Sequence, residues 1–346
     1  MEEKIVIRNA TPADEKRIAE IATQQWTAIN ENYKKLIGDD LYRIFYGTVE
    51  GRVKDVLASL SSLLSNPERF IVTEVDGVVA GFATYRTENV GGVLAGVIGR
   101  NAMDNNYKGR GIAGKQYAIL FERMKKDGCV CAKVHTGMDE MHAPARRAYE
   151  KAGFSGNLPD INYFRTLKPG DEVHNPKPTE ENIVVRGVVP ADEERIMEIA
   201  AQQWDIINNN YKRRIGDELF AIYYGTVEKR VSDVIASLRA MFKNNPEAFV
   251  VTEVNGKVAG FATYRVADVG GVKCGVLGRN GVDNNFKGRG IAGRQYAALY
   301  AKMLADGCTV AKVHTGLDEM HAPARRAYEK SGFNNNIGDV NYYMMF

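Results

Sequence analysis

Apolar residues along the chain follow a helical spacing in some stretches and a strand-like spacing in others. Residues 11–26 carry apolar side chains three or four positions apart, so they are expected to form a helix, and a second helical region follows. The apolar runs 70–74 and 78–86 flank the turn residues Asp76 and Gly77, a pattern that predicts a β-hairpin. Helices are therefore expected to precede the first strands.

The rest of this first half alternates between predicted strands and helices. Residues 91–103, rich in glycine and valine, and residues 129–136 are expected to be strands, with a helix at 115–126 between them. A short helix at 144–151 begins with a proline, which suits the first helical position. A last strand near 161–167 is expected to close the half. The order is helices, an antiparallel meander, and then strand–helix–strand–helix–strand.

The whole pattern occurs twice in the chain, as an internal repeat. Residues 11–26 return almost unchanged at 189–204, and residues 135–154 return at 314–333. The offset is 178 residues early in the repeat (189 minus 11) and 179 later (314 minus 135), which requires one inserted residue, near Lys243. A repeat of this length is a whole domain, because solenoid repeats are roughly 20–50 residues long.

The segment between the copies, LKPGDEVHNPKPTEEN, contains three prolines and few apolar residues. Such a composition predicts a semi-rigid linker or a crossing segment. We therefore expect one domain at 1–167, a linker at 168–182 and a second domain at 183–346. Two domains also fit the length, because 346 residues exceed what a single hydrophobic core usually organises.

The composition is that of an ordinary soluble globular protein, with 45% hydrophobic and 26% charged residues. Lys and Arg number 46 against 43 Asp and Glu, a balance that argues against binding nucleic acid or an anionic membrane through bulk charge. The longest apolar runs are strand-sized, so no transmembrane helix or signal peptide is expected. Four cysteines are too few for a disulfide framework, and we expect a cytoplasmic protein with reduced thiols.

The string KGRGIAG occupies 108–114 and returns at 287–293, each time between a predicted strand and a predicted helix. The backbone N–H groups of such a loop and the first turn of its helix form a site for an anion. Glycines at 109, 111 and 114 would let a phosphate approach without obstruction by a Cβ atom. A plain structural turn is the alternative interpretation.

Two familiar nucleotide-binding motifs match this loop in residue types but not in the sequence around it. The three glycines satisfy the dinucleotide fingerprint, but the following strand at 129–136 lacks the acidic residue that should bind the ribose. The loop also imitates a phosphate-binding P-loop, yet Gln116 stands where Ser or Thr should hold magnesium, and Arg294 replaces the motif's lysine in the second copy. Both interpretations therefore fail in this context.

Residues 103–114, MDNNYKGRGIAG, resemble motif A of the GCN5-related N-acetyltransferase (GNAT) superfamily, which reads R/Q-x-x-G-x-G/A after a long strand. Lys108 occupies the Arg/Gln position, and the glycines follow the pattern. Residues 142–154 resemble the family's second signature, roughly N-x-x-A-x-x-L-Y-x-K-x-G-F, with His142 at the Asn position. The matching residues of that signature are Ala145, Tyr149, Lys151, Gly153 and Phe154, while Ala148 replaces Leu. The resemblance covers essentially the whole of each half.

The resemblance implies an α/β (α+β) fold of two tandem GNAT-like domains, each with a mixed, mostly antiparallel central sheet flanked by helices. It implies direct transfer of an acetyl group from acetyl-CoA to a primary amine of a small molecule or peptide, without a metal. The strands that end at Met103 and Val282 would splay from the next parallel strand and leave a V-shaped slot. The residues expected to contact the coenzyme A thioester are Met103, Lys108, Gly109, Arg110, Gly111, Ile112, Ala113, Gly114 and His142, with Val282, Lys287, Gly288, Arg289, Gly290, Ile291, Ala292, Gly293 and His321 in the second copy.

Tyr149 and Tyr328 fill the position where the family often carries its general acid. A phenol is reasonably matched to a thiolate leaving group, and the alternative interpretation is a core aromatic. His142 and His321 are expected either to contact the pantetheine arm or to cap the helix that follows.

No general base stands out. The strand at 91–103 carries no carboxylate, and its polar residues Arg100 and Asn101 suit binding or orienting better than proton removal. The acids nearest the motifs are Asp104, Asp139 and Glu140, each at least as well suited to be a cap or a surface charge. The acceptor is expected against the first two helices and the later strands, and the recurring aromatics of the helices are either pocket or core residues. These aromatics are Trp26, Tyr33, Tyr42 and Tyr46.

Both signatures occur in both halves, so two acetyl-CoA sites per chain are expected. An alternative is a sensor or scaffold that binds CoA or acyl-CoA without catalysis, which the missing base favours. A transferase for a longer acyl-CoA, and nucleotide binding through the glycine loop, are further hypotheses. The sequence does not predict the acceptor or the oligomeric state.

Overall fold

The computed structural model describes residues 3–170 and 180–346, so most of the expected linker lies outside the described residues. The chain forms two compact units, and neither is a continuous stretch of sequence. The first unit consists of Met1–Leu158, Ile215–Tyr223 and Asp339–Phe346. The second consists of Pro159–Arg214 and Tyr224–Gly338. These units differ from contiguous domains at 1–167 and 183–346, because each contains segments from both copies of the repeat.

The helices and strands of the two copies correspond one to one. The first copy contains β1 (Ile5–Asn9), α1 (Glu15–Ile37), α2 (Asp39–Tyr46), α3 (Val49–Leu63), β2 (Phe70–Val75), β3 (Val78–Val90), β4 (Val93–Met103), α4 (Ile112–Lys126), β5 (Cys131–Gly137), α5 (Ala143–Lys151) and β6 (Gly156–Thr166). The second contains β7 (Ile183–Arg186), α6 (Glu193–Ile215), α7 (Asp217–Tyr224), α8 (Val227–Asn244), β8 (Phe249–Val254), β9 (Lys257–Val269), β10 (Val272–Val282), α9 (Ile291–Ala305), β11 (Val310–Gly316), α10 (Ala322–Lys330) and β12 (Asn335–Met345).

The first predicted helix begins later and runs further than the apolar spacing indicates. A 3-10 turn, Pro12–Asp14, precedes α1, and the Asp14 carboxylate accepts a hydrogen bond of 2.8 Å from the Thr11 backbone N–H. The second helical region divides into α2 and α3 because Gly38 and Gly47 follow α1 and α2 with φ of 83°. The β1 strand, which the pattern did not predict, pairs with β2.

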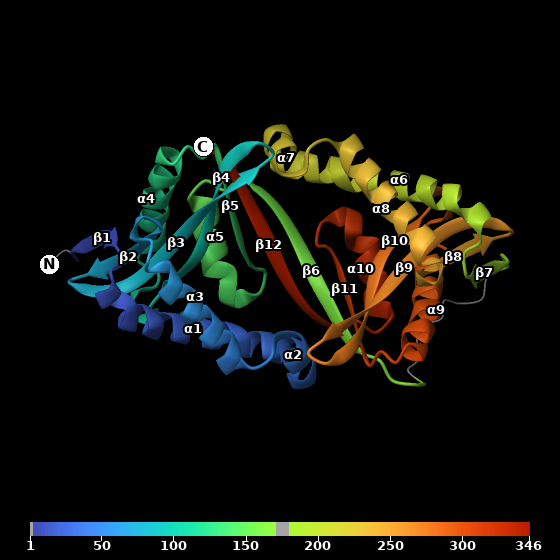
Figure 1. Cartoon of the computed structure of the whole chain (residues 1–346), viewed down its shortest axis with the longest axis horizontal. Helices are drawn as coiled ribbons and strands as arrows, with labels where there is room; N and C mark the ends of the chain where they lie inside the picture. Colours follow the sequence, from blue (N-terminus) through green and yellow to red (C-terminus); the bar gives the residue numbers. More distant parts are fainter. Residues whose placement is uncertain (1–2, 171–179) are drawn as a thin grey trace. The chain divides into compact units, whose positions relative to one another are not determined.

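The first unit is a mixed, mostly antiparallel sheet with helices on both faces, as the fold class predicted (Figure 1). Neighbouring residues of β2 point to opposite faces, and each joins a different hydrophobic cluster. Val72 packs with α1 and α3 around Phe82, whereas Ile71 packs with α4 and α5 around Leu120. The second unit repeats this arrangement with β7–β11 and α6, α8, α9 and α10.

The strand that closes each sheet comes from the other copy of the repeat. In the first unit β5 pairs antiparallel with β12, from Gly137 opposite Asp339 to Cys131 opposite Met345. In the second unit β11 pairs in the same register with β6. Figure 1 shows the red β12 beside β5 and the green β6 beside β11. The strand predicted near 161–167 exists, but the expectation that it closes its own half is wrong.

The physical reason for this error lies in the strands themselves. Both have the same alternation: Ile161 and Tyr163 of β6 are buried, as are Val340 and Tyr342 of β12. Either strand therefore fits either sheet, and local pattern does not distinguish them.

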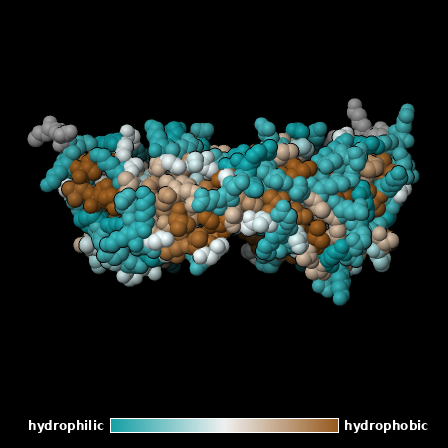
Figure 2. All heavy atoms as spheres, turned by 90° about the horizontal axis from the view of Figure 1, so that it is seen from above, coloured by the Kyte–Doolittle hydropathy of each residue, from teal (hydrophilic) through white to brown (hydrophobic). Residues whose placement is uncertain are grey.

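On the face shown in Figure 2, hydrophilic side chains cover much of the surface and apolar ones show between them. Over the described residues, no helix has the length and apolar content needed to span a bilayer.

Candidate active site

A notch opens in each sheet where two parallel strands separate. Within the described residues, β4 and β5 pair only over 95–97 and 131–133, although both strands continue. A bulge in β4 lies just beyond this short ladder: the register against β3 shifts at Gly99, where a Cβ would come within 2.5 Å of the Thr84 hydroxyl. Such a bulge bends its strand and ends the pairing. The splaying expected for the strand ending at Met103 is therefore present.

The second unit contains the same notch. Its parallel ladder covers 274–276 of β10 and 310–312 of β11. The bulge recurs at Gly278, packed against the Thr263 hydroxyl, which donates 3.0 Å to the Arg279 carbonyl. The repeated glycine-rich strand pattern therefore gives the same bulge in both sheets.

The predicted glycine loop joins β4 to α4 at the wide end of β4. Gly109 and Gly111 have φ of 81° and 72°, and Gly111 is the left-handed N-cap of α4. No side chain caps the helix and no acid lies in its first turn, so its first N–H groups have no side-chain acceptor there. A Cβ placed on Gly109, Gly111 or Gly114 would meet no atom within 4 Å. This open loop of N–H donors, which we call the cradle, can hold an anion.

The cradle of the second unit has the same backbone and is more covered. Gly288 and Gly290 have φ of 84° and 73°, and Gly290 is the left-handed N-cap of α9. Gly293 is buried, whereas its equivalent Gly114 is exposed. The two cradles therefore differ in access to their first helical turn.

The basic residues of the cradle already have protein partners. Lys108 donates 2.7 Å to the Gln25 side chain, and burial lowers its pKa, partly offset by Asp104. Arg110 pairs with Glu3, donates 2.7 Å to the Asn106 carbonyl and lies 5.0 Å from the Tyr107 ring centroid. Arg289 makes the equivalent bonds to Glu181 and the Asn285 carbonyl, and burial lowers the pKa of Lys287.

The apolar residues in and beside the cradle pack their side chains into hydrophobic clusters, so what they offer to a ligand is their backbone. Ile112 is buried with Val75 and Ala80, and Met103 packs against the same cluster. Ile291 and Val282 do the same in the second unit. The remaining members of the predicted set, Ala113 and Ala292, are partly buried against the main cores.

Asp104 anchors the loop and is poorly suited to be a base. Burial raises its pKa, but hydrogen bonds from the Asn106 N–H (2.9 Å) and Arg17 (2.6 Å) outweigh burial and hold the pKa below its usual value. Asp283 has the same environment, with Arg195 as its ion-pair partner. Both carboxylates therefore stay ionised and engaged.

Tyr149 lies in the core with its hydroxyl beside β4. Its ring is 2% exposed, and its hydroxyl accepts a hydrogen bond of 3.0 Å from the Asn101 amide, beyond the bulge. Tyr117 donates 3.1 Å to the same Asn101 side chain, and the two tyrosine rings are 5.1 Å apart. Tyr149 is thus a core aromatic and also presents a phenol next to the notch.

The same trio recurs in the second unit. The Asn280 amide donates 2.9 Å to the Tyr328 hydroxyl, and Tyr296 donates 3.1 Å to Asn280. Burial raises the pKa of Tyr149 and Tyr328, and the hydrogen bonds from asparagine and the second tyrosine oppose it only in part. Both phenols therefore remain protonated at neutral pH, which a proton donor requires. Tyr117 and Tyr296 were missed as site residues because their helical spacing predicts only a core position.

His142 does not cap α5 with its side chain, although it is the N-cap residue. Its Nδ1 lies 2.7 Å from Asp139 Oδ2, and its ring packs on Tyr33 of α1 at a centroid distance of 6.1 Å. His321 repeats both contacts with Asp318 (2.7 Å) and Tyr211 (6.2 Å). The structure therefore joins a histidine and an aspartate into a hydrogen-bonded pair in each unit.

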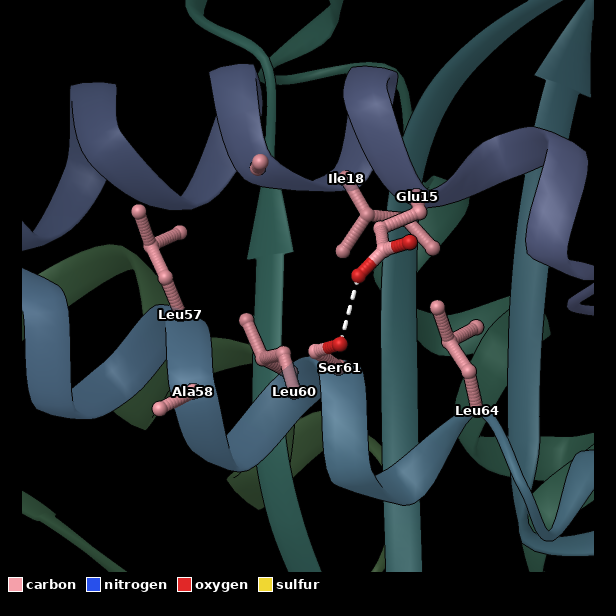
Figure 3. Close-up of a pocket in the computed structure, with 8 residues that line it drawn as sticks. Glu15, Ile18, Leu57, Ala58, Leu60, Ser61 and Leu64 are labelled. Atoms are coloured by element: carbon pink, nitrogen blue, oxygen red, sulfur yellow. Dashed lines mark hydrogen bonds between the residues drawn. The ribbon is translucent and has the colours of Figure 1, made fainter.

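A small pocket lies between α1 and α3, apart from these groups (Figure 3). Its volume is about 220 Å³, and apolar side chains such as Ile18 and Leu57 line it. Ser61 donates 2.5 Å to Glu15 across its opening. None of its lining residues belongs to the cradle, the notch or the histidine–aspartate pair, so we do not place the active site there. Among the described residues, no group of three or more His, Cys, Asp or Glu side chains is arranged to hold a metal ion.

Comparison with known proteins gives a family match in both copies. The sequence model of the acetyltransferase (GNAT) family matches residues 34–154 and again 213–333. Each matched stretch contains one cradle and one histidine–aspartate pair. No protein of curated function matches the chain significantly.

Several solved structures are similar over the whole chain or half of it. A GCN5-related N-acetyltransferase from Sphaerobacter thermophilus is 16% identical, with a TM-score of 0.47 over 99% of this chain and 95% of its own. A tandem GNAT protein from the clavulanic acid biosynthesis pathway is 13% identical, with a TM-score of 0.39 over 99% and 98%. The PaiA N-acetyltransferase from Thermoplasma acidophilum, in complex with coenzyme A, is 17% identical, with a TM-score of 0.34 over 44% and 91%.

Proposed function

This chain belongs to the acetyltransferase (GNAT) family, and from that premise we propose that each unit transfers an acetyl group directly from acetyl-CoA to a primary amine of a small molecule or peptide. The observation that carries the proposal is the pairing of a glycine cradle with a strand notch in both units. Anion-binding N–H groups and an unpaired strand edge are what a diphosphate and an amide-containing arm require. We also propose that the protein works in the cytoplasm, and the four buried, unbridged cysteines support this location.

The donor thioester would be bound by backbone groups. N–H groups from Gly109 to Gly114, and from Gly288 to Gly293, would hold the pyrophosphate, with Lys108 and Lys287 adding charge. The free edge of β4 or β10 would hydrogen-bond the pantetheine arm, and one of its N–H groups would polarise the thioester carbonyl. His142 and His321, at the N-termini of α5 and α10, would contact the same arm.

Tyr149 and Tyr328 would supply the proton that the departing thiolate needs. Each phenol is protonated at neutral pH and is oriented by an asparagine on the splayed strand. The tyrosine ring is fixed by packing, so proton transfer needs no large rearrangement of the side chain.

Two measurements test the proposal. Calorimetric titration with acetyl-CoA is expected to give two sites per chain, and thiol release is expected with at least one member of a panel of polyamines, aminoglycosides, amino acids and peptides. Binding without thiol release from any amine would favour the non-catalytic sensor, and stoichiometry of one or zero would contradict two working cradles. Replacing acetyl-CoA with longer acyl-CoA esters in the same assay tests the acyl length.

A further inference from the structure

The pair formed by His142 and Asp139 has the geometry of a histidine prepared to accept a proton. Burial raises the pKa of Asp139, but the hydrogen bonds with His142 and the Met141 N–H (2.8 Å) outweigh burial. The net effect is a lowered pKa, so the carboxylate stays ionised. Because the ionised Asp139 carboxylate accepts a hydrogen bond from Nδ1, the proton of the neutral imidazole lies on Nδ1. The lone pair of Nε2 is then available. The same bonds hold His321, Asp318 and the Met320 N–H in the second unit.

This histidine is held at the wide end of the notch. Arg146 donates 2.6 Å to the Gly137 carbonyl and 2.8 Å to the Asp139 carbonyl, which fixes the turn between β5 and α5. His142 lies over Gly137, where a Cβ would come within 2.5 Å of Nδ1. Tyr149 follows seven residues later, two turns along the same face of α5. The proposed acid and this histidine therefore lie on one side of one helix.

The exchanged strand adds a carboxylate at this position. Asp339 of β12 is directly opposite Gly137 in the antiparallel ladder, and residues directly opposite share a face of the sheet. Its side chain is 19% exposed and lies 3.9 Å from His135, two residues before Gly137 on the same face. In the second unit Asp160 of β6 is opposite Gly316 and lies 3.1 Å from His314. Each unit thus receives this aspartate from the other copy of the repeat.

Two tyrosines face the same place from the first two helices. Tyr33 packs on His142, and Tyr46 of α2 lies 6.1 Å from Tyr33. Burial raises the pKa of both phenols, to about 12 for Tyr46, and the Asp339 charge adds to the rise in each. The charged and titratable groups around His142 are Asp139, Asp339, His135, Tyr33, Tyr46, Arg146 and, from α3, Arg52. Aromatic faces and carboxylates together favour a cationic ligand.

Resting on the proposed function, we propose that His142 and His321 are the general bases and that Asp339 and Asp160 bind the acceptor as an ammonium. The ammonium gives one proton to Nε2 of the histidine, and the neutral nitrogen forms a bond to the acetyl carbon as the carbon–sulfur bond breaks. Tyr149 or Tyr328 gives its proton to the departing sulfur, and the second proton that nitrogen loses passes through water to the resulting phenolate and restores the phenol. The histidine then returns its proton to water. Each acceptor side is therefore built from both copies of the repeat.

The base is tested by the double variant His142→Asn, His321→Asn. Asparagine can still donate to Asp139 and Asp318, so the turn should keep its structure while the proton acceptor is lost. With an amine that the wild type acetylates, kcat should fall about 100-fold, and the acidic limb of the pH profile of kcat should disappear. The matched control Glu140→Gln, Glu319→Gln changes exposed acids of the same turn and should keep both. An unchanged kcat and pH profile would overturn the base.

The exchanged carboxylates are tested by binding, which does not depend on turnover. In the presence of CoA, 2-phenylethylammonium should bind the wild type about tenfold tighter than its neutral analogue 2-phenylethanol. Asp339→Asn, Asp160→Asn should abolish this preference without changing CoA affinity, and the control Asp39→Asn, Asp217→Asn should keep it. Equal binding of the two probes to the wild type, or an intact preference in the variant, would overturn the assignment. Failure to bind acetyl-CoA at all would instead contradict the proposed function.

Discussion

At the scale of single residues, one side chain serves both packing and the proposed chemistry. The Tyr149 ring contacts Tyr117, Phe154 and Tyr342 in the core, while its hydroxyl is bonded to Asn101 at the notch. A core position is therefore compatible with the proposed acid role, because the two ends of a tyrosine meet different environments. The same is true of Tyr328.

Removing the two hydroxyls separates these roles. In the variant Tyr149→Phe, Tyr328→Phe the rings keep their packing, and the lost hydrogen bonds should cost about 1 kcal/mol each. Steady-state kinetics should show kcat lowered about 100-fold, while titration shows acetyl-CoA affinity nearly unchanged. The control Tyr85→Phe, Tyr264→Phe removes hydroxyls bonded to Asp127 and Asp306 and should leave kcat intact. Equal effects in both variants would exclude the acid role.

At the scale of elements, the junction of β4, the cradle and α4 determines what can bind. A bulge ends the pairing of β4 with β5, and two glycines in the left-handed region turn the chain into an uncapped helix. Gly111 needs its backbone freedom, since its φ of 72° is strained for other residues. Gly114 is different: it lies inside the helix, exposed and with open space around it.

The substitution Gly114→Val uses this difference. Valine is no worse than glycine in a helix, so folding should be unaffected and the melting temperature should not fall. Its side chain would occupy the space above the first helical turn, and titration should find one acetyl-CoA per chain instead of two. Ile119→Val, elsewhere on α4, is the control and should retain two. Two unperturbed sites in Gly114→Val would show that the first cradle does not hold the diphosphate.

At the scale of the whole molecule, the two copies are completed by each other's last strand. Without β12, the first unit would expose the edge of β5 along seven residues. An unpaired edge of this length readily accepts another strand, and β6 has the alternation that β5 requires. The exchange therefore couples the two copies within one chain in the way that swapped dimers couple two chains.

The isolated segment 1–167 is expected to reveal this coupling. With no β12 present, β6 of one molecule should pair with β5 of a second, giving a reciprocal dimer with two acceptor sides that contain Asp160. Light scattering coupled to size-exclusion chromatography measures the mass. Co-expression with 168–346 should convert the dimer into a one-to-one complex of the two segments. A compact monomer of 1–167 would show that β6 folds back within its own copy.

The sequence alone determined the repeat, the order of helices and strands, the cradle and the two signatures. These features follow from local patterns: apolar spacing, glycines at positions that need them, and motif residues close together in the chain. The tertiary structure decided which copy supplies each closing strand, and hence that Asp339 lies opposite Gly137, over which His142 is held. Two strands with the same alternation satisfy the same sheet, so only long-range pairing of β5 with β12 and of β11 with β6 distinguishes them.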